Sequence, residues 1–190
     1  MIILFWCTSA STILLAFALL SRKGVWDDFV SGDASFTDLD NADGFAGLAI
    51  VLQFALLLAS AIVTCLWAKR IAENAKARGV TSVSPGMAAG GWFIPLGNWF
   101  LGFDQLRKSV TGVGGTSAGL NIWQGLFVAQ SLVLVAINRF GSFSVDSPEG
   151  VSDQLRNQGL VGVVGGILYI LATIFATKAA KQIDTAVTGS

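Results

Sequence analysis

The chain has 190 residues, of which 53% are hydrophobic and 13% are charged, and its formal net charge is zero. Because a soluble domain carries about 25% charged residues, this composition excludes an ordinary soluble domain and predicts an all-α integral membrane protein. The absence of histidine removes the commonest metal ligand, haem ligand and general base. We therefore expect no catalytic, cofactor or metal site. Nucleic-acid binding is not expected either, because the chain has no basic patch larger than a positive-inside cluster.

The first apolar segment covers residues 1–21. A cleaved signal peptide begins with basic residues, whereas here the basic pair Arg22–Lys23 follows the apolar run. We therefore predict a retained transmembrane helix. Cys7 and Cys65 both fall in apolar segments, where free thiols pack as small hydrophobic side chains, so no disulfide is expected.

An acidic stretch follows at residues 24–45 and contains six aspartates. Part of it resembles a calcium-binding EF-hand loop, but Leu39 and Ile50 occupy positions where that loop needs acidic ligands. The stretch is instead typical of a solvated loop whose Asp and Asn residues cap the next helix.

The second helix is predicted at residues 46–78, with the membrane span at 46–68 and Gly79 as its stop. Gln53, Ser60 and Thr64 recur at spacings of seven and four, which places them on one stripe of the helix. Polar stripes in lipid face other helices.

The central segment, residues 85–108, is apolar and rich in glycine and aromatic residues, and it is interrupted by Pro95. The glycines and the proline make it a poor spanning helix, so we predict a re-entrant or interfacial segment on the cytoplasmic side. On a helical wheel Trp92, Trp99 and Phe103 share one face. Its candidate interfacial residues are Trp92, Phe93, Pro95, Asn98, Trp99 and Phe103. Anchoring at the headgroup level is the expected role, and docking of a partner is the alternative.

A glycine-rich linker at 110–119 precedes the third predicted span at 120–138. Gln124, Ser131 and Asn138 recur there every seven residues. Together with the stripe on the second helix they predict a polar seam between these two helices. The seam residues are Gln53, Ser60, Thr64, Gln124, Ser131 and Asn138.

The last helix is predicted at 148–181, because Ser147 and Pro148 form a helix-start signal. Its membrane span covers residues 159–177. Gly162 and Gly166 form a G-x-x-x-G pair, and small residues at this spacing let two helices approach closely. The four helices and the central segment are expected to form a single membrane domain over residues 1–190.

Four spans with both termini on one side place eight basic residues on that side and four on the other. The positive-inside rule then puts both termini and the central segment in the cytoplasm. The acidic residues divide the other way, three against nine. The basic pair Arg22–Lys23 lies on the opposite side from this basic excess.

A short pattern within residues 67–107 carries a family resemblance. It consists of Trp67, Asn74, Ser84–Pro85–Gly86, Gly91–Trp92–Phe93–Ile94–Pro95, Asn98 and Leu106–Arg107. The pattern resembles a family of small four-helix membrane proteins from actinobacteria that is catalogued only as a domain of unknown function. Gly91 stands here where that family has a second tryptophan. The resemblance implies a four-helix architecture in the bacterial inner membrane, and it implies no activity.

From these features we predict a non-enzymatic protein that works by contact, as an accessory, scaffold or regulatory subunit of a membrane assembly. Its expected partners are the lipid bilayer and either other membrane-protein subunits or a second copy of the chain. A channel or transporter for ions or small solutes, using the polar seam, is the alternative. Transport pathways usually place ionisable residues at membrane depth, and the predicted spans contain none.

Overall fold

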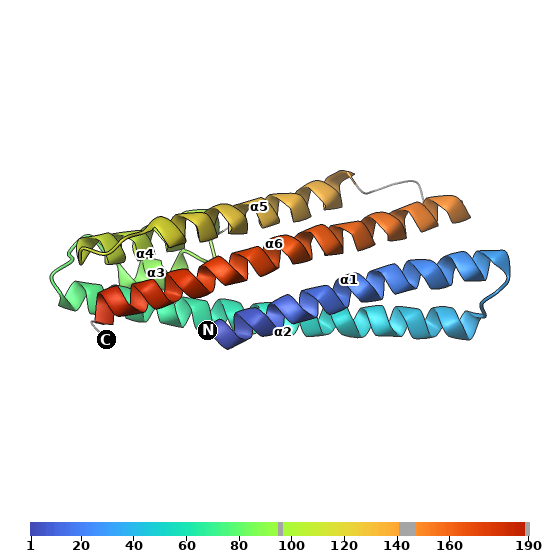
Figure 1. Ribbon diagram of the computed structural model, residues 1–190, viewed down its shortest axis with the longest axis horizontal. Coiled ribbons are helices and arrows are strands. Elements are labelled where there is room, and N and C mark those ends of the chain that lie inside the picture. The colour runs from blue at the N-terminus through green and yellow to red at the C-terminus, as the bar shows by residue number, and fades with distance from the viewer. Residues whose placement is uncertain (95–96, 141–146, 189–190) are drawn as a thin grey trace. The chain divides into compact units, whose positions relative to one another are not determined.

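The computed structural model describes residues 1–94, 97–140 and 147–188, and the side chains of 133–140 and 188 lie outside this description. Every regular element in the described residues is helical (Figure 1). The elements are α1 (Ile2–Ser31), α2 (Phe36–Ala77), α3 (Pro85–Gly90), the 3-10 turn η1 (Gly97–Trp99), α4 (Leu101–Gly112), α5 (Ala118–Phe140) and α6 (Pro148–Thr188).

Three helices, α1, α2 and α6, are long and apolar enough to cross a membrane. The chain is therefore a multi-pass membrane protein, and the all-helical fold class is confirmed. The predicted span at 120–138 lies within α5, which has 23 residues and is about 35 Å long. The side chains of residues 133–138 in that span, including Asn138, lie outside the described part of the chain, as does Pro95 of the central segment.

The prediction of an acidic loop over residues 24–45 is wrong for most of its length, because α1 runs to Ser31 and α2 begins at Phe36. Ser35 and Asp38 form a capping box: the Ser35 hydroxyl accepts from the Asp38 N–H (3.3 Å), and the Asp38 carboxylate accepts from the Ser35 N–H (2.8 Å). An ion pair between Lys23 and Asp27, four residues apart, supports the end of α1.

The other helix ends follow the local signals more closely. Gly79 has φ 90°, which favours glycine, and α2 ends two residues before it. The α6 helix begins at Pro148 as predicted, and the Ser147 hydroxyl accepts a hydrogen bond from Gly150 N (3.1 Å). It continues past the predicted end at 181, because Ile183 and Val187 are buried in a hydrophobic core.

The described chain divides into two compact units, and α1, α2, α5 and α6 each contribute residues to both. Unit 1 comprises residues 1–6, 58–128 and 170–190. Unit 2 comprises residues 7–57 and 129–169.

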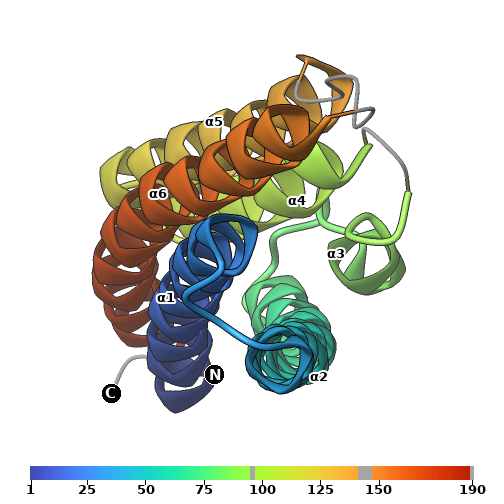
Figure 2. The same cartoon turned by 90° about the vertical axis from the view of Figure 1, so that its right-hand side faces the viewer.

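Unit 1 contains a large apolar core in which α2, α4, α5 and α6 all take part. Phe103, Leu106 and Ile71 are its largest fully buried side chains. The short helix α3 packs on α4, and both are shown in Figure 2. Met1 and Val187 pack in this same core, so both ends of the chain belong to unit 1.

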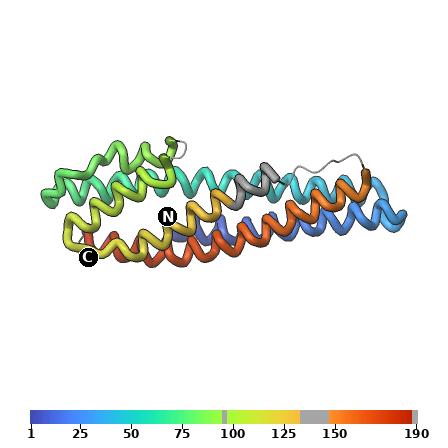
Figure 3. Tube along the Cα trace, turned by 90° about the horizontal axis from the view of Figure 1, so that it is seen from above, coloured from blue at the N-terminus to red at the C-terminus, as the bar shows by residue number. Residues whose placement is uncertain are grey.

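Unit 2 is built mainly from helix pairs. The helices α1 and α2 run antiparallel (Figure 3). Its buried apolar cluster consists of three alanines, Ala18, Ala46 and Ala49, with Leu15 packed against them. Small side chains allow the helices of this unit to approach closely.

Candidate functional site

The central segment begins with a short, firmly capped helix. The Ser84 hydroxyl accepts from the N–H of Met87 (3.3 Å), and Pro85 occupies the first turn of α3. The side-chain oxygen of Gln105 on α4 accepts from the Ser84 N–H (2.8 Å). Because Gln105 is buried, this bond ties the start of α3 to α4. The Ser84–Pro85–Gly86 motif is thus a helix start.

Glycine at position 102 lets the chain fold back on itself. A Cβ atom at Gly102 would overlap the indole ring of Trp92. A Cβ at Gly91 would lie 2.9 Å from the Cβ of Leu101. No single helix joins residues 92 and 103, since η1 and the turns before it separate α3 from α4. The helical-wheel face predicted for Trp92, Trp99 and Phe103 therefore does not exist.

An aromatic cluster replaces that face. Its members are Phe5, Trp92, Phe103, Trp123 and Phe127, all in unit 1. The Phe103 ring is fully buried, and its centroid lies 4.8 Å from that of Trp92 and 5.0 Å from that of Trp123. Aromatic pairs at such distances add about 0.5–1.5 kcal/mol each beyond the area they bury. The cluster therefore fixes the central segment to α5 and to the start of α1.

Other large side chains of the central segment are exposed. They are Met87, Phe93, Ile94 and Phe100, which we call the exposed apolar set. Phe93 and Phe100 are 64% and 57% exposed, whereas Trp92 and Trp99 are partly buried. The most exposed aromatic side chains of the segment are thus Phe93 and Phe100, which directly follow the two tryptophans in the sequence. Trp92 Nε1 and Asn98 Oδ1 are buried and have no hydrogen-bond partner within the described residues.

Arg107 on α4 is held by two neutral side chains of α5. Its Nε donates to Asn121 Oδ1 (3.1 Å), and its Nη2 donates to Gln124 Oε1 (2.6 Å). Gln124 Nε2 in turn donates to the backbone oxygen of Trp99 (2.8 Å). We call Arg107, Asn121 and Gln124 the arginine clamp. The sequence singles out Arg107 in the family pattern and Gln124 in the seam, but it does not pair them, because they lie on two different helices.

The predicted seam residues lie in several places. Gln53 is 9% exposed, its amide oxygen accepts from Ser11, and its Nε2 donates to Thr12 Oγ1 (2.9 Å). Both partners are on α1, in unit 2. The hydrogen bonds of Gln124 go to Arg107 and to Trp99, so among the described side chains neither glutamine is bonded to another seam residue.

The other described seam residues are Ser60, Thr64 and Ser131. Ser60 and Thr64 are buried, and the Thr64 hydroxyl donates to the Ser60 carbonyl (2.7 Å). Ser131 is partly buried on α5, and the Asn138 side chain lies outside the described residues. A continuous seam between α2 and α5 stays a prediction.

The G-x-x-x-G pair of α6 lies against α1 in unit 2. A Cβ at Gly162 would be 3.1 Å from Ala16 Cα, and a Cβ at Gly166 would be 3.7 Å from a methyl carbon of Thr12. Of these two glycines, Gly162 therefore lies closer to α1.

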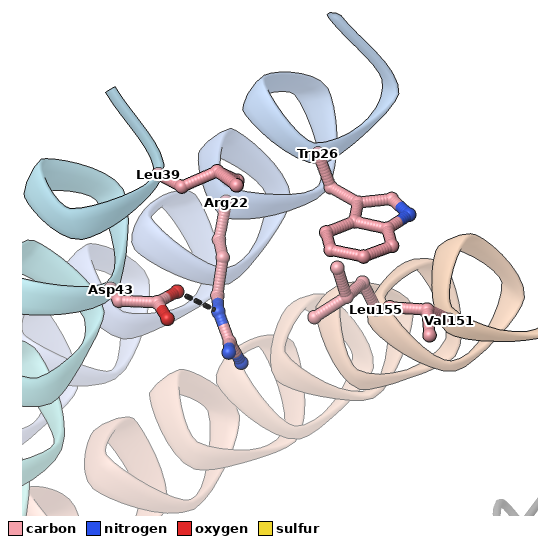
Figure 4. Close-up of a pocket in the computed structure, with 6 residues that line it drawn as sticks. All are labelled: Arg22, Trp26, Leu39, Asp43, Val151 and Leu155. Carbon is pink, nitrogen blue, oxygen red and sulfur yellow. Dashed lines mark hydrogen bonds and ion pairs between the residues drawn. The ribbon is translucent and has the colours of Figure 1, made fainter. Parts of the chain in front are cut away.

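A small cavity of about 110 Å³ lies in unit 2 among α1, α2 and α6 (Figure 4). Its lining is Arg22, Trp26, Leu39, Asp43, Val151 and Leu155, and Arg22 pairs with Asp43. The described residues contain no group of three or more His, Cys, Asp or Glu that could hold a metal ion.

Beside this cavity the polar end of α1 is bonded to the first turns of α6. The Ser152 hydroxyl donates to Asp27 (2.7 Å), and Trp26 Nε1 donates to the Pro148 carbonyl (3.2 Å). The Lys23 ammonium and then the Ser152 hydroxyl hold the pKa of Asp27 below its usual value. Asp27 lies beyond the apolar stretch predicted to span the membrane.

A family model described as a domain of unknown function (DUF4328) matches residues 31–185. None of the curated proteins and none of the solved structures matches the chain. The matched range contains the central segment, the arginine clamp and four of the five residues of the aromatic cluster.

Proposed function

The chain belongs to the DUF4328 family, and we propose that it is a non-enzymatic membrane protein that acts by contact, as a small accessory, scaffold or regulatory subunit of a membrane assembly. The observation that carries this proposal is the broad uncovered face of α2. Of the three spanning helices α2 is the least covered, with 28% of its apolar stretch buried. Between residues 46 and 68 its exposed large side chains are Leu48, Ile50, Val51, Leu52, Phe54, Leu57, Leu58, Ile62 and Leu66. Such a face accepts either lipid or a helix of a partner protein.

The polar side chains near this face are engaged inside the chain, which favours contact over transport. Gln53 is bonded to Ser11 and Thr12, and Thr64 is bonded to the Ser60 carbonyl. A channel or transporter through the predicted seam would need such groups to face a water-filled path. Flux of ions or small polar solutes into liposomes that contain the purified protein would establish that alternative.

Photo-crosslinking in native membranes tests the contact proposal. A photoreactive phenylalanine analogue at Ile62, which is 47% exposed, should give a protein adduct of defined mass. The same analogue at Ile71, which is 2% exposed on the same helix, is the matched control and should give none. Adducts at Ile62 that contain lipid but no protein would count against the accessory-subunit role.

We further propose that α5 is the fourth span and that both termini lie in the cytoplasm, with the chain in the plasma membrane. Unit 1 carries eight basic and three acidic residues, a formal net charge of +5, and unit 2 carries four basic and nine acidic residues, a net charge of −5. The positive-inside rule assigns unit 1 to the cytoplasmic side. Because both chain ends belong to unit 1, an even number of spans fits.

Labelling from outside the cell tests this topology. In a variant without Cys7 and Cys65, a cysteine introduced by Asp33→Cys in unit 2 should react with an impermeant maleimide. A tag at the C-terminus should stay protected until the cells are opened. Labelling of the tag in intact cells would reverse or refute the assignment.

The central segment is proposed to lie at the cytoplasmic face of the bilayer. The exposed apolar set supports this placement, because four large apolar side chains on a segment too short and irregular to span find a favourable environment at the lipid boundary. The aromatic cluster provides the opposite, buried attachment.

A further inference from the structure

We propose that the arginine clamp is a binding site for the phosphate group of an anionic phospholipid. The proposal rests on the interfacial placement of the central segment given above, and not on the existence of a protein partner.

The positive charge of Arg107 is not paired with an acidic side chain within the described residues. Within the described residues the Arg107 guanidinium donates only to neutral amide oxygens, those of Asn121 and Gln124. The nearest acid along α4, Asp104, pairs with Lys108 at 2.6 Å. These two charges offset each other, so the guanidinium of Arg107 has no counter-ion within the described residues. An anion beside it would therefore meet a full positive charge.

The second argument is geometry. A guanidinium has five N–H groups, and the clamp uses one on Nε and one on Nη2. The Nη1 atom makes no hydrogen bond within the described part of the chain. The amide oxygens of the clamp hold the planar group in place, so little side-chain freedom remains to be lost on binding. A rigid, half-buried guanidinium with free donors matches the oxygens of a phosphate.

Exposed apolar side chains lie near the arginine clamp, and they favour a lipid over a free phosphate ion. Gln124 joins the clamp to the backbone of Trp99, and the next residue is Phe100, which is 57% exposed. The rest of the exposed apolar set lies on α3 and the turn after it, and α3 packs on α4. A phospholipid supplies both a phosphate for Arg107 and acyl chains for these apolar side chains. The net charge of +5 on unit 1 adds a preference for an anionic headgroup.

Lipid binding by the intact protein in detergent micelles tests the site. Native mass spectrometry would count phosphatidylglycerol and phosphatidylcholine molecules bound at increasing lipid concentration. We expect the wild type to bind the first phosphatidylglycerol more tightly than phosphatidylcholine. Arg107→Gln should weaken this binding about tenfold, because the charge-assisted hydrogen bonds to the phosphate are lost. Arg70→Gln removes an equal charge from an exposed position of unit 1 and should change it less than twofold.

A lysine variant and a competition with inorganic phosphate separate lipid binding from misfolding and from binding of a soluble anion. Arg107→Lys keeps the charge and loses the planar fork, so it should give intermediate binding even if the glutamine variant fails to fold. Inorganic phosphate should not displace the lipid at equal concentration. Equal losses in the Arg70 and Arg107 variants, or no preference for phosphatidylglycerol in the wild type, would overturn the proposal. Displacement by inorganic phosphate would show a soluble-anion site instead.

Failure of the membrane placement is recognised separately. A nitroxide attached at Phe100→Cys, in the variant without the native cysteines, reports its depth in a bilayer. A label in bulk water refutes the interfacial placement and the lipid site together. A label at the lipid boundary, combined with unaltered lipid binding in both Arg107 variants, refutes the lipid site alone.

Discussion

The two units of this chain share the long helices α1, α2, α5 and α6 but are stabilised in different ways. Unit 1 has a net charge of +5 and a core of large side chains, with Phe103 and Leu106 fully buried. Unit 2 has a net charge of −5, and its buried apolar cluster is made of alanines. Its helices are joined by a glycine contact at Gly162 and by the hydrogen bonds of Gln53.

This difference shows how packing depends on the available driving force. Large aromatic side chains stabilise a core when burial removes them from water. Between helices surrounded by lipid that force is absent, so close approach of small residues and polar contacts must serve instead. We therefore expect unit 1 to respond strongly to loss of apolar volume, and unit 2 to respond to added volume and lost hydrogen bonds.

The largest effect is expected from Phe103→Ala. Removing a fully buried ring that touches Trp92, Trp123 and Phe127 should cost about 3–5 kcal/mol. Hydrogen exchange followed by mass spectrometry in detergent would measure each unit separately. Protection should fall in α3, α4 and the start of α5 and remain in residues 7–57. Equal loss in both units would show that they unfold as one body.

Gly102→Ala is the next strongest change. The added methyl group would overlap the indole of Trp92, and overpacking of this kind typically costs about 1–3 kcal/mol. Gly125→Ala on α5 is the matched control, because no atom lies within 4 Å of its new Cβ, and alanine favours helix by about 0.8–1 kcal/mol. Thermal unfolding in detergent should place the two variants on opposite sides of the wild type. If Gly102→Ala is as stable as the wild type, the fold-back of the central segment is looser than described.

Unit 2 is tested by Gly162→Ala. The new methyl carbon would lie 3.1 Å from Ala16 Cα, a backbone atom that moves only with its helix, so we expect a loss of about 1 kcal/mol. Gly165→Ala, one turn along on α6, meets nothing within 4 Å and should be neutral or stabilising. Cysteine crosslinking between α1 and α6 would follow the contact. Equal behaviour of the two variants would remove close packing from the description of unit 2.

Features of the fold that are encoded by residues close together in the sequence can be predicted, whereas contacts between distant residues cannot. The membrane character, the start of α6 at Ser147–Pro148 and the end of α2 near Gly79 are encoded within a few residues, and they follow from the sequence. The capping box of Ser35 and Asp38 is equally local. It was missed because the six aspartates of that stretch indicated a solvated loop.

The aromatic cluster and the arginine clamp could not be read in the same way. Trp92 stacks on Trp123 from a different element, with a centroid distance of 6.2 Å. Arg107 finds its acceptors on α5, beyond a turn whose path no sequence pattern specifies. A helical wheel assumes one continuous helix. Trp92 follows the end of α3 and Phe103 lies on α4, so the two residues do not lie on one helix and a helical wheel does not describe their contact. Tertiary contacts of this kind need the fold to be known.

A smaller effect is expected from Gln53→Leu. The change keeps most of the side-chain volume and removes the hydrogen bonds to Ser11 and Thr12. Hydrogen bonds between membrane helices contribute about 0.6 kcal/mol on average. A double-mutant cycle with Thr12→Val isolates the pair, since Thr12 also bonds the Thr8 carbonyl. A coupling energy near zero would leave small-residue packing as the stabilising feature of the α1–α2 pair.

The smallest expected effect is the response of unit 2 to acid. Lys23 and Ser152 lower the pKa of Asp27, so the folded state releases this proton more readily than the unfolded state does. The contribution of Asp27 is therefore present above the usual aspartate pKa and is lost as the pH falls through the lowered one. Thermal unfolding measured between pH 6 and pH 3 should show a decline that is shallower in Asp27→Asn. The Asp153→Asn variant, whose residue pairs only with Arg156 three positions away, should keep the wild-type slope. If Asp27→Asn declines as steeply as the wild type, the hydrogen bond between Asp27 on α1 and Ser152 on α6 does not contribute to the stability of unit 2.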